Sequence, residues 1–494
     1  EAEFQHQLAL ESPVMAANEE TTLDIVVGRL HDAAEKTRQV WLPPLPSTIS
    51  LDKILGPATL TTQRGFSVAR ENYLTFTLGI KDKPLEQWQG PMDINFLGSN
   101  GNGVIIGSPQ SGKTTALRTL ILSAALSHTP EEVNFYIIDM AGSGFKYLER
   151  LPHVGGVTTR MEEEKLHRLV AEIKHLLAER ELLFSNNNIE SAEQLRTIRA
   201  SGKLKDNFAT DVFLVIDGWS TLKKDYDTLS DEIQNLAQRG LGYGIHVLFT
   251  SGRWADFKLP LQAVIGTKIE LHINDPLDSV VGKKFMVGME DAPRGRALTM
   301  DKLYNQICLP TFSDPNMGSD DIDELLTTIA NSWRHNTAPP VRLLPELITY
   351  SEIRKQFPAA NGAVVGLDEA NLGPAEFDLY GAQRLLLMFG DSQSGKTSTL
   401  KTLISEFIRG KDFNEVMVCI VDLRRSLLGL VPPDFIGEYA GTRNSVDVLI
   451  NALQQELDRR QPPANITIEQ LQDKSWWSGP ELYLVVDDYE MIEG

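Results

Sequence analysis

The chain has 494 residues, 42% of them hydrophobic, and a formal charge of −20 from 47 basic and 67 acidic side chains. This length allows two large domains with substantial cores. The acidic balance disfavours nucleic-acid binding over most of the surface, although it leaves room for a local basic channel. We expect no transmembrane helix, because no run approaches 18 apolar residues, and no signal peptide is visible. The cysteines Cys308 and Cys419 lie in apolar runs, which predicts buried free thiols.

The first part of the chain resembles a linker that leads into a domain. Residues 1–19 are expected to be the tail of a preceding domain or a remnant that is not native to the protein. A helical pattern follows over residues 22–40, with Thr21 and Thr22 as candidate caps, and the proline-rich segment 41–46 ends it. A strand-like run at 73–79 then leads toward the first glycine-rich motif.

Residues 107–114 read Gly-x-x-x-x-Gly-Lys-Thr, between an apolar run and a helical pattern. In this strand–loop–helix setting, backbone N–H groups and the helix N-terminus bind phosphate oxygens, the lysine reaches the β- and γ-phosphates, and the threonine hydroxyl binds Mg²⁺. We therefore assign nucleotide binding to Gly107, Ser108, Pro109, Gln110, Ser111, Gly112, Lys113, Thr114 and Thr115.

The same motif returns at residues 390–397, again after an apolar run. Its nucleotide-binding residues are expected to be Gly390, Asp391, Ser392, Gln393, Ser394, Gly395, Lys396, Thr397 and Ser398. A strand that ends in aspartate follows each loop, at 133–139 and at 416–422, and a long amphipathic helix comes next in both copies. This repeat predicts an α/β fold of tandem P-loop NTPase domains (RecA/FtsK-like), with mainly parallel sheets flanked by helices. The expected domains are 20–319 and 320–494, the second of them incomplete at its C-terminal side.

A second aspartate-ending strand in each copy predicts the magnesium site. Asp217 ends the run 212–217, and Asp487 ends the run 482–487. A P-loop enzyme uses such an aspartate together with the loop threonine to hold Mg²⁺. We expect Thr114 with Asp217 in the first site, and Thr397 with Asp487 in the second, to hold ATP–Mg²⁺.

The position after each of these aspartates predicts weak catalysis. Many ring ATPases place a glutamate there to polarise the attacking water, but this chain has Gly218 and Asp488. Glycine supplies no base, and the aspartate is one methylene shorter, so only Asp488 is a candidate catalytic residue and a weak one. Slow or absent hydrolysis is expected. The alternative is that Asp139 or Asp422 substitutes for the missing base.

Several other polar residues have two interpretations. Arg253 either senses a phosphate or is a solvated loop residue. Arg239, Lys268 and Arg294 either reach a neighbouring nucleotide site or are surface cations. His246 and His153 show no metal-ligand spacing, which predicts structural roles.

The segment 244–253 resembles the stretch after the magnesium-site strand in FtsK/SpoIIIE-type ATPases, with Gly252 where that family often has glutamine. The chain resembles one family more specifically, the EccC family of ESX (type VII) secretion ATPases. The segments that carry this resemblance are residues 41–46, 151–156, 217–219, 266–270 and 475–488. That resemblance implies three tandem ATPase domains after a membrane anchor, of which this chain would hold the second and part of the third.

The resemblance also implies partners. EccC-like proteins export Esx/WXG100, PE and PPE proteins, read a C-terminal signal on them, and work as hexamers with other ESX membrane-complex subunits at the cytoplasmic face of the membrane. No nucleic-acid partner is expected. Two alternatives stay open at this point, namely a DNA translocase of the FtsK/HerA class and a pair of hydrolytically competent ATPase domains.

Overall fold

The structure is a computed structural model, and it describes residues 21–31, 33, 41–70, 72–142, 144–204, 208–312, 322–369, 372–379, 384–473 and 476–492. The chain divides into two compact units, Glu1–Val341 and Arg342–Gly494. Residues 1–19, expected to be the tail of another domain, lie outside the described residues. Among the helices that the structure describes, none combines the length and the apolar character needed to cross a bilayer.

The first described helix, α2 (Thr22–Leu30), begins with a capping box in which the Thr21 hydroxyl accepts from the Asp24 N–H and the Asp24 carboxylate accepts in return. It has no buried residue. The helical pattern extended to residue 40 in the sequence, but residues 34–40 lie outside the described part. The chain continues with α3 (Asp52–Leu55) and the antiparallel pair β1 (Ala58–Thr61) and β2 (Gly65–Val68).

A ten-stranded sheet forms the centre of the first unit, in the order β4-β3-β12-β11-β10-β5-β9-β8-β6-β7. The strands from β10 to β7 are parallel, and those from β4 to β11 pair antiparallel with their neighbours. This confirms the predicted fold class. The strands are β3 (Thr75–Lys83), β4 (Trp88–Asn95), β5 (Gly103–Ile106), β6 (Val133–Asp139), β7 (Val154–Thr159), β8 (Asp211–Asp217), β9 (Ile245–Ser251), β10 (Thr267–Glu270), β11 (Arg296–Thr299) and β12 (Tyr304–Ile307).

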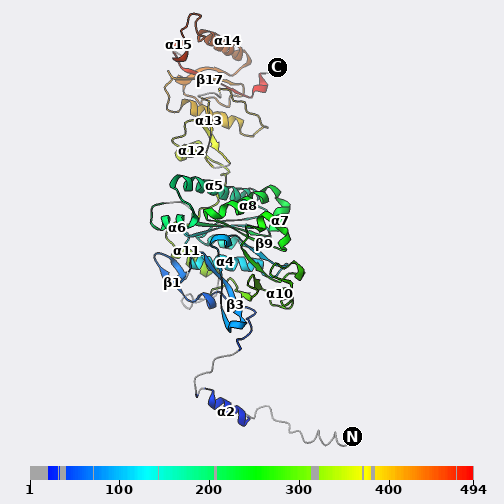
Figure 1. Cartoon of the computed structure of the whole chain (residues 1–494). Helices are drawn as coiled ribbons and strands as arrows, with labels where there is room; N and C mark the ends of the chain where they lie inside the picture. The colour runs from blue at the N-terminus through cyan, green and yellow to red at the C-terminus, as the bar shows by residue number, and fades with distance from the viewer. Residues whose placement is uncertain are drawn as a thin grey trace. The chain divides into compact units, whose positions relative to one another are not determined.

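Helices cover both faces of this sheet (Figure 1). Successive strand residues point to opposite faces, so Ile105 joins the core beneath α4 (Lys113–Ser127), while Val104 and Ile106 join the core beneath α5 (Glu163–Asn187). The segment that follows β8 forms two helices, α7 (Trp219–Asp225) and α8 (Asp227–Arg239), because the chain turns at Tyr226. Three short helices complete the unit: α6 (Ala192–Ala200), α9 (Leu259–Gln262) and α10 (Lys283–Val287).

Helix α11 (Ile322–Ser332) lies within the expected second domain, 320–494, but packs in the first unit. Its buried residues Leu325, Leu326 and Ile329 belong to the core beneath α4. The chain then stays attached to β7, because Val341 N–H donates to Gly155 O at 3.0 Å. The compact unit therefore runs to residue 341 in three dimensions, beyond the boundary at 319/320 that the sequence repeat predicts.

The second unit contains α12 (Tyr350–Gln356), the antiparallel pair β13 (Ala363–Leu367) and β14 (Pro374–Phe377), and a parallel sheet in the order β16-β15-β17. Its remaining elements are α13 (Lys396–Ile408), β15 (Val416–Asp422), β16 (Ile436–Ala440), α14 (Arg443–Arg459), α15 (Ile468–Asp473) and β17 (Glu481–Asp487). The order of loop, helix and aspartate-ending strands repeats that of the first unit.

The apolar run before the second loop differs from the expectation. Residues 384–390 form no strand, and Leu385, Leu387 and Phe389 are 80%, 67% and 90% exposed. In the first unit, the equivalent strand β5 is held between β9 and β10, which both follow β8 in the chain. The described part of the second unit has no strand after β17, so this run has no neighbour to pair with.

Candidate nucleotide sites

The first phosphate loop has a backbone that few residues other than glycine adopt. Gln110 and Gly112 have φ angles of 61° and 111°, and a Cβ atom on Gly107 would collide with the Ser111 hydroxyl. This curled loop joins β5 directly to the N-terminus of α4. The Ser111 hydroxyl is buried and has no hydrogen-bond partner among the described residues, so the loop holds one polar atom that its own fold leaves unsatisfied.

Lys113 folds back over this loop. Its Nζ donates to Gly107 O at 2.7 Å and to Ser108 O at 2.9 Å. Burial lowers the pKa of Lys113, and the negative charge of Asp217 opposes that shift. A cation held at the mouth of the loop is the group that binds the outer phosphates of a nucleotide in P-loop proteins.

Asp217 lies beside the loop threonine at the carboxyl end of β8. Thr114 Oγ1 donates to its Oδ2 at 2.7 Å, and Thr250 Oγ1 donates to its Oδ1 at 2.5 Å. Thr250 comes from β9 and also accepts from the Gly218 N–H at 2.9 Å. No sequence motif marks Thr250, since its position depends on β9 lying next to β8 in the sheet.

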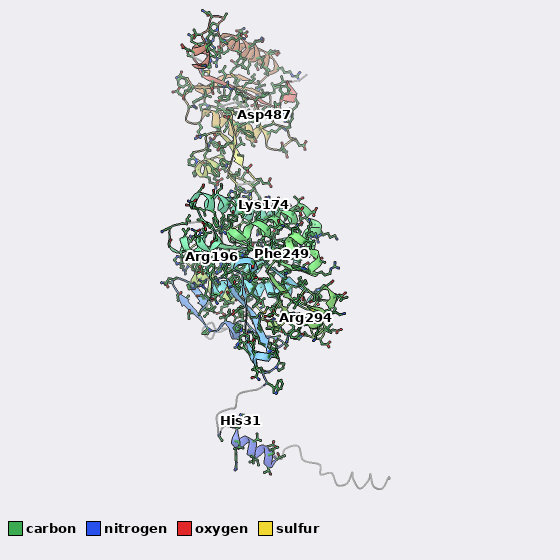
Figure 2. All side chains as sticks on the ribbon, viewed as in Figure 1. His31, Lys174, Arg196, Phe249, Arg294 and Asp487 are labelled. Atoms are coloured by element: carbon green, nitrogen blue, oxygen red, sulfur yellow. The ribbon has the colours of Figure 1, made fainter. Side chains whose placement is uncertain are left out.

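Two segments from the far side of β5 brace the first loop. Ser108 N–H donates to His272 O at 2.8 Å, and Gly295 N–H donates to Ser111 O at 3.1 Å. Arg294, labelled in Figure 2, places Nη2 at 3.5 Å from Gln110 Oε1. Arg294 therefore lies at the phosphate loop of its own unit.

The second loop repeats the geometry of the first. Gln393 and Gly395 have φ angles of 66° and 96°, and Lys396 Nζ donates to Gly390 O at 2.6 Å and to Asp391 O at 3.0 Å. Residues 390–394 are all exposed, whereas Gly107, Ser108 and Ser111 of the first loop are buried, because the described part of the second unit has no segments equivalent to the two braces.

The threonine–aspartate pair that is expected to bind magnesium is also repeated. Thr397 Oγ1 lies 3.1 Å from both carboxylate oxygens of Asp487, the residue labelled at the end of β17 in Figure 2. Ser426 Oγ donates to Asp487 Oδ2 at 2.6 Å. A hydroxyl beside a carboxylate supplies the hard oxygen ligands that Mg²⁺ prefers. Together with the unsatisfied Ser111 hydroxyl and the loop lysines, both donor sets fit a nucleoside triphosphate with Mg²⁺.

The two aspartates proposed as alternative bases are hydrogen-bond acceptors for the turns that follow them. Asp139 Oδ2 accepts from Gly144 N at 3.0 Å. Asp422 accepts from the N–H groups of Ser426 and Leu427 and from the Tyr439 hydroxyl at 2.8 Å. Burial alone would raise the pKa of Asp422, but these hydrogen bonds outweigh it and hold the pKa below its usual value. Asp422 is therefore a poor general base, since its pKa is lowered and its oxygens already accept hydrogen bonds.

The residue after each aspartate that is expected to bind magnesium has the same left-handed backbone. Gly218 has φ 95° and Asp488 has φ 52°. The Asp488 carboxylate is already paired, with its Oδ2 2.8 Å from Arg424 Nε. Aspartate tolerates this conformation better than most residues, whereas a glutamate at either position would be strained.

The remaining candidates have local partners within the first unit. Arg239 pairs with Glu181 at 2.5 Å, Arg253 lies 3.9 Å from Asp256, and Lys268 lies over the Trp254 ring at 4.6 Å. His153 faces His128 O at 2.8 Å, and His246 lies between Gly101 O and Asp211. Cys308 and Cys419 are buried and free, as predicted.

Comparison with known proteins assigns this pair of sites to a family. Residues 71–314 match the FtsK/SpoIIIE family. The chain is 36% identical over 479 residues to the ESX secretion system protein EccC of Thermomonospora curvata, and 34% identical over 489 residues to the ESX-1 secretion system protein EccCb1 of Mycobacterium tuberculosis. The chain belongs to the EccC family. The alignments cover 96% of this chain in both cases, and 36% and 80% of the two EccC relatives.

Solved EccC structures have the same fold. The cytoplasmic domain of the type VII secretion ATPase EccC of T. curvata matches with a TM-score of 0.77 at 35% identity, over 97% of this chain and 57% of that one. A structure of EccC ATPases 2 and 3 from the same organism, in complex with a signal sequence peptide, matches with a TM-score of 0.73 at 36% identity, over 92% of this chain and 83% of that one. The chain therefore spans about a third of the full-length EccC relative and most of the EccCb1 relative.

Proposed function

We propose that this chain is the nucleotide-regulated, substrate-receiving part of an ESX secretion motor. Its two loops would bind ATP–Mg²⁺ through Lys113, Thr114 and Asp217, and through Lys396, Thr397 and Asp487. In the proposed role, bound ATP stabilises each unit and controls an active ATPase domain elsewhere in the motor, with little hydrolysis here. Bound ligand stabilises a fold by about 2.7 kcal/mol at 100 times its Kd, which is enough to make nucleotide a structural component.

The observation that carries this proposal is the identity of the residue after Asp217 and after Asp487, where many ring ATPases have a glutamate that activates the attacking water. Glycine occupies this position in the first unit, and in the second unit the carboxylate of Asp488 is paired with Arg424. The nearby acids Asp139 and Asp422 already accept hydrogen bonds from their own turns. Each unit thus keeps the loop lysine, the threonine and the aspartate that the proposal assigns to ATP–Mg²⁺, while a free base is lacking among the candidate residues.

The proposed assembly follows from the family. The chain would correspond to ATPases 2 and 3, with 20–319 and 320–494 as its sequence repeats, at the cytoplasmic face of the membrane. The related T. curvata structure holds a signal sequence peptide, which supports a role in receiving secreted Esx/WXG100, PE or PPE proteins. A homo-hexamer with other ESX membrane subunits is the proposed working form. A DNA translocase would instead show DNA binding that falls steeply with salt concentration.

ATP turnover of the purified chain tests the catalytic part of the proposal. We expect turnover far below the range of about 1–1000 s⁻¹ that is typical of working enzymes, because the candidate bases among the described residues are missing, as at Gly218, or already engaged. Asp139→Asn and Asp422→Asn should leave this low rate unchanged. A rate within that range, lost in Lys113→Ala or Lys396→Ala, would instead support competent ATPase domains. Loss of that rate in either asparagine variant would identify the substituting base.

A further inference from the structure

The two units differ at a pair of positions that lie together in space. In the second unit, Arg424 Nε is 2.8 Å from Asp488 Oδ2, and Arg424 is 61% exposed while Asp488 is 15% exposed. In the first unit, the equivalent positions are Ala141 and Gly218, as judged from the matching registers of β6 with β8 and of β15 with β17. A Cβ on Gly218 would lie 3.6 Å from the Ala141 backbone nitrogen, so these positions are also neighbours there. The chain thus has both members of an ion pair in one unit and neither in the other.

The turn that carries Arg424 is fixed to the magnesium-site aspartate. Ser426, two residues later, donates its hydroxyl to Asp487 at 2.6 Å and its N–H to Asp422 at 3.0 Å. Arg424 is held less firmly, because its guanidinium is mostly exposed and, besides Asp488, its Nε contacts the Met491 sulfur at 3.4 Å, which is a weak acceptor. An arginine on a fixed turn beside the metal site can exchange one anionic partner for another without a change in the fold.

Charge explains why the pair matters for nucleotide binding. Asp488 directly follows Asp487, which contacts the loop threonine, and Ser426 on the turn that carries Arg424 also contacts Asp487, so the ion pair lies next to the proposed metal site. An unpaired carboxylate there would repel a triphosphate more than a diphosphate, since the terminal phosphate brings the additional negative charge closest. Arginine neutralises the carboxylate, and it also binds phosphate oxygens through parallel N–H donors.

We propose that Arg424 and Asp488 form a latch that lets the second site distinguish a nucleoside triphosphate from a diphosphate. In this mechanism, the terminal phosphate competes with Asp488 for the Arg424 guanidinium, and loss of that phosphate returns Arg424 to Asp488. Arg424 is a positioning residue with no role in bond cleavage. The first site lacks the pair and so lacks this means of discrimination. The inference rests on the proposed binding of ATP–Mg²⁺ at the second loop.

The test uses the full chain carrying Lys113→Ala, so that only the second loop binds, and measures Kd for ATP and for ADP by calorimetry with Mg²⁺ present. Adding Arg424→Ala should weaken ATP binding about tenfold, with less than a twofold change for ADP, because Asp488 then faces the terminal phosphate unpaired. Adding Asp488→Asn to that variant should recover only part of the lost ATP affinity, because it removes the unpaired carboxylate but not the loss of the guanidinium–phosphate contact. Arg424→Lys, which keeps the charge, should retain most of the preference for ATP.

One result would overturn the latch while leaving nucleotide binding intact, namely an unchanged ratio of ATP to ADP affinity in Arg424→Ala. Equal losses of both affinities would indicate a purely structural role, and no change in either would indicate no role in binding. A failure of the proposed function looks different. In that case the Lys113→Ala parent itself binds neither nucleotide, and further addition of Lys396→Ala changes nothing, which would overturn the latch as well.

Discussion

Lys113→Ala is expected to weaken ATP–Mg²⁺ binding at the first site by about 100-fold. Lys113 Nζ lies at 2.7–2.9 Å from two loop carbonyls, at the position from which a lysine reaches the outer phosphates. Loss of a charge-assisted hydrogen bond costs about 1.5–3 kcal/mol, and the remaining loop keeps only its N–H donors. Lys396→Ala should have the same effect at the second site. Titration with a fluorescent ATP analogue would show one binding event lost in each single variant and both lost in the double variant.

The control for this experiment is Lys174→Ala. Lys174 lies on α5, where its Nζ pairs with Glu232 at 2.8 Å, and it is labelled in Figure 2. Its removal changes the net charge by the same amount as Lys113→Ala but should leave both binding events unchanged. Equal affinity in wild type and Lys113→Ala would show that the first loop does not hold the nucleotide.

Asp211→Ala is expected to destabilise the first unit by about 3–5 kcal/mol, because it leaves buried partners without their counter-charge. Asp211 is fully buried at the start of β8. Its carboxylate accepts from Arg196 at 2.7 and 2.8 Å, from His246 Nε2 at 2.9 Å and from the Tyr73 hydroxyl at 2.9 Å. Figure 2 labels Arg196. Chemical denaturation followed by circular dichroism would measure the loss.

The same carboxylate predicts a direction for the pH dependence. Burial alone would raise the pKa of Asp211, but hydrogen bonds from Arg196 and His246 outweigh it and hold the pKa well below the usual range. The stabilisation is therefore present above the unfolded-state pKa of about 3.9 and is lost as pH falls further. Asp231→Ala is the matched control, because Asp231 forms an exposed pair with Lys258 and should have little effect on stability. Similar losses in both variants would contradict this account of the Asp211 cluster.

The sequence predicts the phosphate loops well because their chemistry is local. Within one short stretch, glycines, lysine and threonine specify a strand–loop–helix turn, and both loops have the expected curled backbone. The Thr114–Asp217 and Thr397–Asp487 contacts were also predictable, since the carboxyl ends of parallel strands meet at one edge of a sheet.

Features that depend on strand order could not be read from the sequence. Thr250 reaches Asp217 only because β9 neighbours β8, and Arg294 reaches Gln110 only because the segment before β11 folds back over the loop. The apolar run 385–389 reads as a buried strand, but burial requires neighbouring strands that the described part of its unit does not provide. For the same reason, α11 reads as part of the second repeat, although its apolar face packs in the first core.

The nucleotide retained by the chain after purification without added ATP tests the central claim most directly. Mass analysis of the released nucleotide, with Lys113→Ala and Lys396→Ala to assign each site, would identify what each loop holds. We expect intact ATP from both sites. Lys113→Ala should lose the ATP of the first loop, and Lys396→Ala should lose the ATP of the second. ADP in both sites, or a wild-type chain that cannot be loaded with ATP–Mg²⁺, would contradict it.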